Sequence, residues 1–226
     1  FNAKHNKQTF VCGSIGPTNR TASLSPKVED LSYRNVTFDQ LYGAYYEQID
    51  GLVQGGIDIV MIETIFDTLN CKAAIIAVKD YFENKKINLP IMISVTIVDK
   101  SGRTLSGQTL EAFWHTIKFA KPLSVVINCA LGVTDMDPYL KELSKISNCF
   151  ISAFPNAGLP NELGEYDDSP SFMAEEIKKL ANDGILNIIG GCCGTTPEHI
   201  SAIKDKLFES SPRIVPKIDY DTSYTG

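Results

Sequence analysis

The apolar and polar positions of this chain alternate in a way that predicts six strand–helix pairs. Six short apolar runs have the character of strands that are covered on both faces. These runs cover residues 9–15, 57–63, 90–97, 123–129, 149–154 and 185–190. A long polar loop at 18–36 follows the first run, and every run is followed in turn by apolar residues at helical spacing.

The helix after the first loop has the clearest boundaries. Thr37 with Gln40 forms a capping box, and Gly55-Gly56 ends the apolar repeat. The remaining helices are expected at about 68–82, 109–120 and 136–147, from Ser169-Pro170, and from Pro197 with Thr196 as its cap.

Strict alternation of strand and helix predicts a parallel sheet with its helices outside. An open doubly wound sheet and a barrel both satisfy this pattern, but no Gly-x-Gly-x-x-Gly follows the first strand to favour a dinucleotide fold. Polar residues gather at several strand ends, as in barrel enzymes. These are Gly13-Ser14, Glu63, Asn128-Cys129, Asn156 and Cys192-Cys193. We therefore expect a (β/α)8 TIM-type barrel that lacks its first two βα units, whose place would be before residue 1.

Composition narrows the class of protein. The chain of 226 residues has 43% hydrophobic residues, a net charge of −6 and a pI near 5.1. An acidic surface argues against nucleic acid as a partner, and no apolar run is long enough to span a bilayer. The polar N-terminus does not resemble a signal peptide. Six cysteines are too few for a disulfide scaffold of this size, so we expect a reduced, cytoplasmic protein.

Three cysteines at strand ends suggest a metal site. Cys129 ends one predicted strand, and Cys192 and Cys193 follow another among Gly190, Gly191 and Gly194. Three thiolates can hold zinc and leave its fourth position open, which is the mark of a catalytic site. Two alternatives stay open, because Cys129 can be a small buried apolar residue and the adjacent pair can form a strained disulfide. Cys12, Cys71 and Cys149 lack a motif partner and are expected to be ordinary core or surface thiols.

Two acidic residues follow the second strand. Nothing local explains a carboxylate at Glu63, so we expect it to bind a substrate ammonium group. Asp67 opens the next helix, and complementing the helix N-terminus is a sufficient explanation for it. We expect His5, His115 and His199 not to be ligands.

Five stretches of the chain, in order, resemble a known family. They are Gly13–Pro26, Ile62–Asn70, Asn128–Ala130, Pro155–Pro160 and Gly190–Thr195. The chain resembles the homocysteine-binding domains of cobalamin-dependent methionine synthases, within the homocysteine S-methyltransferase family. The Asn-Cys and Gly-Gly-Cys-Cys-Gly motifs are shared across that family, whereas the first two stretches favour the cobalamin-dependent branch.

The resemblance implies a set of site residues. Cys129, Cys192 and Cys193 would hold zinc, and Glu63, with groups near Gly13, Ser14 and Asn128, would bind the amino acid part of homocysteine. Asp67 is a further substrate-binding candidate. Residues 1–210 would form the homocysteine-binding barrel, and 211–226 would begin a linker toward a folate-binding domain.

The resemblance also implies a reaction. Zinc would activate the homocysteine thiol, which takes a methyl group from methylcobalamin, ultimately from methyltetrahydrofolate, to give methionine. Cobalamin-binding and folate-binding domains of the same polypeptide would be the partners. Two alternatives are a homocysteine methyltransferase that uses betaine or S-methylmethionine, and a non-enzymatic zinc or thiol-redox module.

Overall fold

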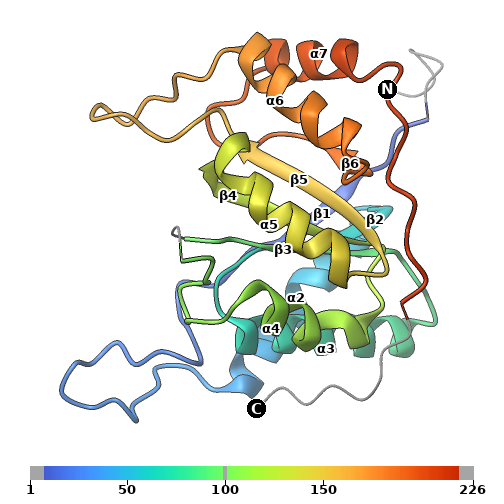
Figure 1. Ribbon diagram of the computed structural model, residues 1–226. Helices are drawn as coiled ribbons and strands as arrows, with labels where there is room; N and C mark the ends of the chain where they lie inside the picture. The colour runs from blue at the N-terminus through green and yellow to red at the C-terminus, as the bar shows by residue number, and fades with distance from the viewer. Residues whose placement is uncertain (1–7, 99–100, 219–226) are drawn as a thin grey trace.

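The structure is a computed structural model that describes residues 8–98 and 101–218, and its centre is one parallel sheet (Figure 1). Within the described residues the strand order is β1-β2-β3-β4-β5-β6. The strands are β1 (Cys12–Ile15), β2 (Ile59–Ile65), β3 (Ile91–Val95), β4 (Ser124–Gly132), β5 (Phe150–Asn156) and β6 (Ile188–Ile189).

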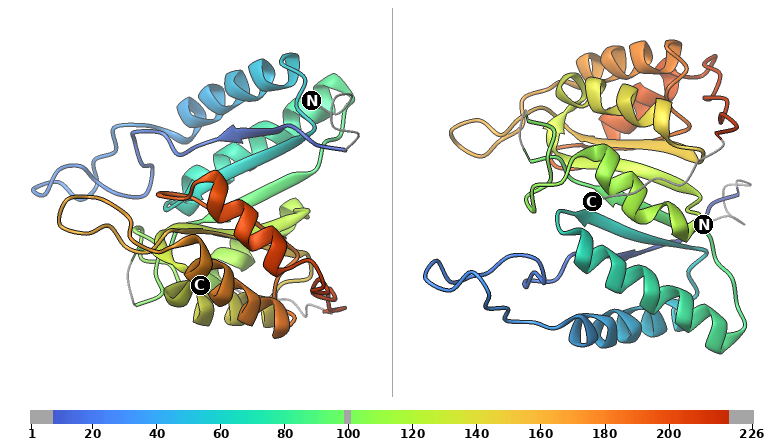
Figure 2. Two further views of the ribbon diagram at one scale, coloured as in Figure 1. Left: turned by 90° about the horizontal axis from the view of Figure 1, so that it is seen from above. Right: turned by 60° about the horizontal axis from the view of Figure 1, so that its bottom comes forward.

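The helices lie around the outside of the curved sheet, as two views of the ribbon show (Figure 2). They are α2 (Phe38–Gln54), α3 (Thr68–Lys85), α4 (Leu110–Ile117), the short 3-10 helix η1 (Lys118–Ala120), α5 (Val133–Ile146), α6 (Pro170–Asn182) and α7 (Pro197–Lys206). The predicted capping box of Thr37 and Gln40 is present at the start of α2. In the described ranges, no helix combines the length and apolar character needed to cross a bilayer.

Each strand pairs with its neighbour in sequence, so the sheet curls in one direction. A doubly wound sheet would instead reverse its strand order near the middle. The fold is therefore the predicted α/β type, a partial TIM-type barrel of six parallel strands. Among the described residues, β1 and β6 each pair on one side only. That two further βα units close the barrel stays a prediction.

The two faces of the sheet differ in character. Outward residues such as Ile15, Ile62 and Ile127 are fully buried with the helices in one apolar core. Successive side chains of a strand point to opposite faces, so the residues between them face inward. Many inward residues are polar: Ser14, Glu63, Ser94, Ser124, Asn128, Ser152 and Asn156. The inner face at the carboxyl ends of the strands is thus where polar chemistry collects.

The bounds of three elements depart clearly from the prediction. β4 continues past Cys129 to Gly132, and α5 begins at once with Val133 instead of near residue 136. Only Ile188 and Ile189 of the expected 185–190 strand enter the ladder. Ile185 and Leu186 are buried against the core, so their apolar character reflects packing and not strand pairing.

The segment after α7 returns to the sheet. Arg213 is only 6% exposed, and its guanidinium donates hydrogen bonds to the carbonyl oxygens of Ser144, Ser147 and Cys149, each at 2.8 Å. The first residues of the predicted linker, 211–218, therefore include a buried anchor. Residues 219–226 lie outside the described part, and the domain boundary at 210 stays a prediction.

Candidate metal centre

Cys129 lies at a bend near the end of β4. Cys129 and Ala130 have φ angles of 59° and 58°, and the register with β5 is irregular between Asn128 and Gly132. A residue with a Cβ in this left-handed region costs of order 1–3 kcal/mol, and such residues cluster at functional sites. The bend places Cys129 part-buried, beside the loop that carries the other two cysteines.

Backbone hydrogen bonds hold the Cys192-Cys193 loop against the end of β5. The amide of Cys192 donates to the carbonyl oxygen of Pro155 at 2.8 Å. The amide of Cys193 donates to Oδ1 of Asn156 at 3.1 Å, and its carbonyl accepts from the amide of Ala157 at 2.9 Å. The position of both thiols is therefore set by β5 as well as by β6.

Two glycines beside the pair are needed for different reasons. Gly194 has a φ of +77°, and a Cβ there would lie 2.4 Å from the Cβ of Tyr166. A Cβ on Gly191 would lie 2.4 Å from Cγ2 of Thr195. Gly194 thus supplies the left-handed turn, whereas Gly191 supplies space.

The three thiols form one cluster. The sulfur of Cys193 lies 3.7 Å from that of Cys129 and 3.9 Å from that of Cys192, and all three sulfurs lie within 4.8 Å of one another. A tetrahedral ion with Zn–S bonds of about 2.3 Å holds its sulfurs about 3.8 Å apart. The donor set and its spacing both fit zinc. All six cysteines are free thiols, so the adjacent pair is not a disulfide.

The thiols perturb one another's protonation. Burial, followed by the charges of Cys129 and Cys193, raises the pKa of Cys192 to about 12. Burial also acts to raise the pKa of Cys193, but hydrogen bonds from Cys129, Tyr166 and Cys192 outweigh it and lower that pKa. A bound cation would relieve the repulsion that three neighbouring thiolates would otherwise have.

Tyr166 is a residue of this site that the sequence did not predict. It belongs to the hairpin loop, residues 157–168, which joins β5 to α6. Its side chain packs on Gly194, and a hydrogen bond with the Cys193 thiol is the main reason its pKa is raised. Tyrosine in a polar loop has no periodic signal, so no indication of this contact was present in the sequence.

Ser14 and Glu63 meet across β1 and β2. The Ser14 hydroxyl donates a hydrogen bond to Oε1 of Glu63, and the carboxylate is half-buried. Gly13 beside them is buried, and a Cβ there would lie 2.8 Å from the Ile57 side chain. A carboxylate and a hydroxyl on the inner face of the barrel can accept hydrogen bonds from an ammonium group.

Asn128 is buried at the centre of a polar network. Its Oδ1 accepts hydrogen bonds from the hydroxyls of Ser94 and Thr96, and its Nδ2 donates to Oγ1 of Thr64 at 2.9 Å. Thr64 also has a left-handed φ of 57°. Asn128 therefore connects the bend after Glu63 to the bend at Cys129.

Asp67 is 2% exposed, and protein groups surround its carboxylate. It accepts hydrogen bonds from the amides of Leu69 and Asn70 as the N-cap of α3. It also accepts from the amide and the hydroxyl of Ser23 in the 18–36 loop. The helix-capping explanation is confirmed, and Asp67 additionally fixes that loop.

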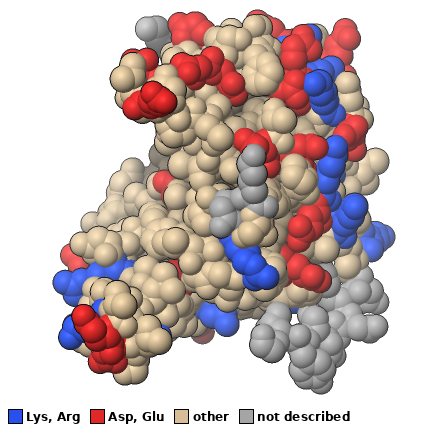
Figure 3. Space-filling view, turned by 60° about the vertical axis from the view of Figure 1, so that its left-hand side comes forward, with Lys and Arg blue, Asp and Glu red and all other residues tan. Residues whose placement is uncertain are grey.

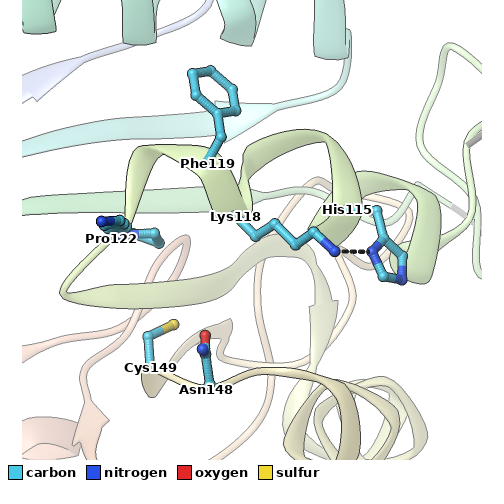
Figure 4. Close-up of a pocket in the computed structure, with 7 residues that line it drawn as sticks. His115, Lys118, Phe119, Pro122, Asn148 and Cys149 are labelled. Carbon is cyan, nitrogen blue, oxygen red and sulfur yellow. Dashed lines mark hydrogen bonds between the residues drawn. The ribbon is translucent and has the colours of Figure 1, made fainter. Parts of the chain in front are cut away.

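The other candidate groups lie apart from the cluster. His199 is buried in the α7 capping box, and its Nε2 hydrogen-bonds with the carbonyl oxygen of Asp168 at 2.9 Å. His115, Lys118 and Cys149 are among the residues that line a cavity of about 550 Å³ (Figure 4). The cavity lies where β4 and β5 begin, at the opposite end of the sheet from Cys129, Cys192 and Cys193, so it is not part of this site.

Two long loops border the end of the sheet that carries the cysteines. The 18–36 loop and the hairpin loop, residues 157–168, project on the same side of the molecule (Figure 1). A space-filling view of this side shows a hollow between two protruding parts, with mostly uncharged atoms around it (Figure 3). The fold and site together define a barrel-type protein with a three-thiol centre at the carboxyl ends of its strands.

The family follows from comparison of the whole chain. Residues 2–207 match the family model for homocysteine S-methyltransferase, and the chain belongs to that family. The sequence resemblance to this family is thereby confirmed, whereas membership of its cobalamin-dependent branch stays a prediction.

Solved structures of a homocysteine methyltransferase, MmuM from Escherichia coli, share the fold. The apo form is 20% identical with a TM-score of 0.63, the metallated form 21% with 0.63, and the oxidized form 18% with 0.67. Each alignment covers 91% of this chain, but only 66%, 64% and 64% of the respective MmuM chains. The chain thus spans about two thirds of the length of these relatives.

Proposed function

We propose that this protein binds zinc through Cys129, Cys192 and Cys193 and methylates the thiol of homocysteine to give methionine. The observation that carries the proposal is the approach of three free thiols, all within 4.8 Å, at the carboxyl ends of barrel strands in a member of this family. Zinc held by three sulfurs keeps one position open for a substrate thiol and lowers the pKa of that thiol.

The chain's own residues then bind and orient the amino acid. We assign the ammonium group to the Glu63 carboxylate, with the Ser14 hydroxyl beside it. Gly13 leaves room beside β1 for the Ile57 side chain, and Asn128 holds the two strand bends that direct Glu63 and Cys129. Asp67 contributes indirectly by fixing the 18–36 loop at the rim.

The methyl donor that we propose is methylcobalamin, with methyltetrahydrofolate as the source of the methyl group. The support is the likeness of Gly13–Pro26 and Ile62–Asn70 to the cobalamin-dependent branch. Cobalamin-binding and folate-binding domains of the same polypeptide would present the donor in a reducing cytoplasm. The second candidate is a homocysteine methyltransferase that uses betaine or S-methylmethionine. We test it alongside the first because MmuM, which shares this fold, is also a homocysteine methyltransferase.

A donor comparison tests the proposal. The zinc-loaded protein would be incubated with homocysteine and, separately, with methylcobalamin, S-methylmethionine or betaine, and methionine would be quantified. We expect methionine from methylcobalamin only. Product from another donor would replace the cobalamin assignment and keep the family reaction. Zinc binding without product from any donor would support the non-enzymatic zinc module instead.

A further inference from the structure

We propose that the cavity at the start of β4 and β5 is a second binding site, for a small organic phosphate whose phosphate group is bound by Lys118 and Lys121. The cavity has a volume of about 550 Å³ and lies at the opposite end of the sheet from the three thiols. Cavities that hold small molecules typically have about 300–1,000 Å³. The site is separate from the zinc centre and does not depend on the methyl transfer.

Two segments form the walls of the cavity (Figure 4). His115 and Lys118 come from α4 and η1, and Lys121 follows η1 with a left-handed φ of 50°. Asn148 and Cys149 face them from the turn between α5 and β5. A ligand in the cavity therefore contacts the end of one helix and the start of the next strand together.

The lining is basic although the protein as a whole is acidic, with a net charge of −6. All lining residues belong to the described part of the chain, and they include Lys118 and Lys121 but no aspartate or glutamate. A cleft lined by charges of one sign raises the local concentration of ions of the opposite sign. The charge of this lining favours an anion.

His115 holds Lys118 along the cavity wall. The ammonium nitrogen Nζ of Lys118 lies 2.8 Å from Nδ1 of His115. An ammonium group has donors only, so Nδ1 accepts this hydrogen bond and a neutral His115 carries its proton on Nε2. Nε2 in turn lies 3.8 Å from the carboxylate of Glu111, one helical turn earlier. The position of the Lys118 ammonium group is thus set before a ligand binds.

Arg213 removes a source of repulsion beside the cavity. The carbonyl groups at a helix end carry partial negative charge, and α5 ends next to the cavity. Arg213 donates hydrogen bonds to the carbonyl oxygens of Ser147 and Cys149, both at 2.8 Å. Burial raises the pKa of the Cys149 thiol to about 11, although the Arg213 charge acts against this. At neutral pH the thiol is therefore uncharged and does not repel an anion.

The lining also indicates the kind of anion. Two ammonium groups match a dianion better than a monoanion, and a phosphate ester carries about −1.5 to −2 charges at pH 7. The Asn148 amide can donate a further hydrogen bond. The buried Pro122 offers apolar surface to the organic part of the ligand. These features together favour a small phosphate ester over a carboxylate.

Titration calorimetry of phenyl phosphate into the purified protein tests the proposal, and we expect saturable one-to-one binding. A variant with both Lys118→Gln and Lys121→Gln should have a dissociation constant about tenfold higher or more, because two charge-assisted hydrogen bonds are lost. The matched control combines Lys72→Gln with Lys204→Gln, which removes two charges from exposed positions on α3 and α7. It should bind as the wild type does. Equal weakening in both variants, or no binding to the wild type, would overturn the proposal.

Two further measurements on the wild-type protein locate the ligand and identify the group that is recognised. In nitrogen-15 NMR spectra, phenyl phosphate should shift the amide signals of Asn148 and Cys149 and leave those of Cys192 and Cys193 unchanged. Shifts at the cysteine pair alone would refute a second site. Benzoate keeps the ring but has one charge, and it should bind several-fold more weakly. Equal affinity for benzoate and phenyl phosphate would show that the phosphate is not recognised.

Discussion

Asn128 donates a hydrogen bond from Nδ2 to Oγ1 of Thr64 at 2.9 Å, and this bond joins two strand bends across the sheet. Thr64 has a left-handed φ of 57°, and Cys129, the residue after Asn128, has one of 59°. Thr64 follows Glu63, so the proposed substrate carboxylate and a proposed zinc ligand are both adjacent to this contact. We infer that this bond fixes the position of Glu63 relative to Cys129.

Replacing Asn128 with Leu should destabilise the fold. Asn128 is 3% exposed, and Leu would leave the hydroxyls of Ser94 and Thr64 without this partner in a buried place. Each lost partner costs about 1–3 kcal/mol, so we expect a loss of at least about 2 kcal/mol in the free energy of unfolding. Urea unfolding measures it. Thr64→Ala removes only one acceptor and should lose less; an equal loss would refute the central role of Asn128.

Alanine at Cys129, Cys192 or Cys193 should abolish stoichiometric zinc binding. Each thiol supplies one of three converging sulfurs, and two sulfurs hold a zinc ion far more weakly than three. Metal analysis of the purified variants measures the zinc content per chain. Cys12→Ala is the control because Cys12 is an exposed thiol apart from the cluster, and it should keep its zinc. Full zinc content in Cys192→Ala would remove that residue from the ligand set.

Glu63→Gln should weaken homocysteine binding and leave zinc binding nearly unchanged. A hydrogen bond to a charged group contributes about 1.5–3 kcal/mol, so we expect the dissociation constant to rise about tenfold or more. Calorimetric titration of homocysteine into the zinc-loaded proteins measures it. Glu47→Gln on the exposed side of α2 is the control. If Glu63→Gln binds homocysteine as the wild type does, Glu63 is a structural residue paired with Ser14.

Arg213→Ala should lower stability although Arg213 lies beyond the last helix. Three carbonyl oxygens lose their charged donor in a buried place, and we expect a loss of about 2–4 kcal/mol. Thermal unfolding followed by circular dichroism tests this. Ile214→Ala is the matched control, because Ile214 is the next residue and its side chain is 91% exposed. Similar melting temperatures for both variants would mean that the segment does not contribute to the fold.

The sequence predicted the parts of the site that follow from local patterns. The order of strands and helices placed Cys129 and Cys192 at strand ends, because carboxyl ends of parallel strands share one edge. The cap at Asp67 was readable from its position before a helix. Such features depend on a few neighbouring residues, which is why one sequence sufficed.

Contacts between distant segments were not predictable in the same way. Tyr166 packs on Gly194, the residue after Cys193, because the hairpin loop folds back, and Arg213 meets carbonyl groups more than sixty positions earlier in the chain. The left-handed backbone of Cys129 and Ala130 also has no sequence signal, since neither residue is a glycine. It persists because surrounding tertiary contacts determine it.

The hydrogen bonds that hold the Cys192-Cys193 loop to Pro155, Asn156 and Ala157 involve no metal ion. In small zinc-finger domains, by contrast, the ion creates the fold and chelation unfolds the chain. In the proposed zinc centre, the backbone of β5 and the Asn156 side chain would maintain the positions of the Cys192 and Cys193 sulfurs, so loading and removal of the ion would be a reversible exchange on a preformed scaffold. On this proposal, the centre would exchange ligands with a substrate thiol while the polypeptide around it keeps its shape.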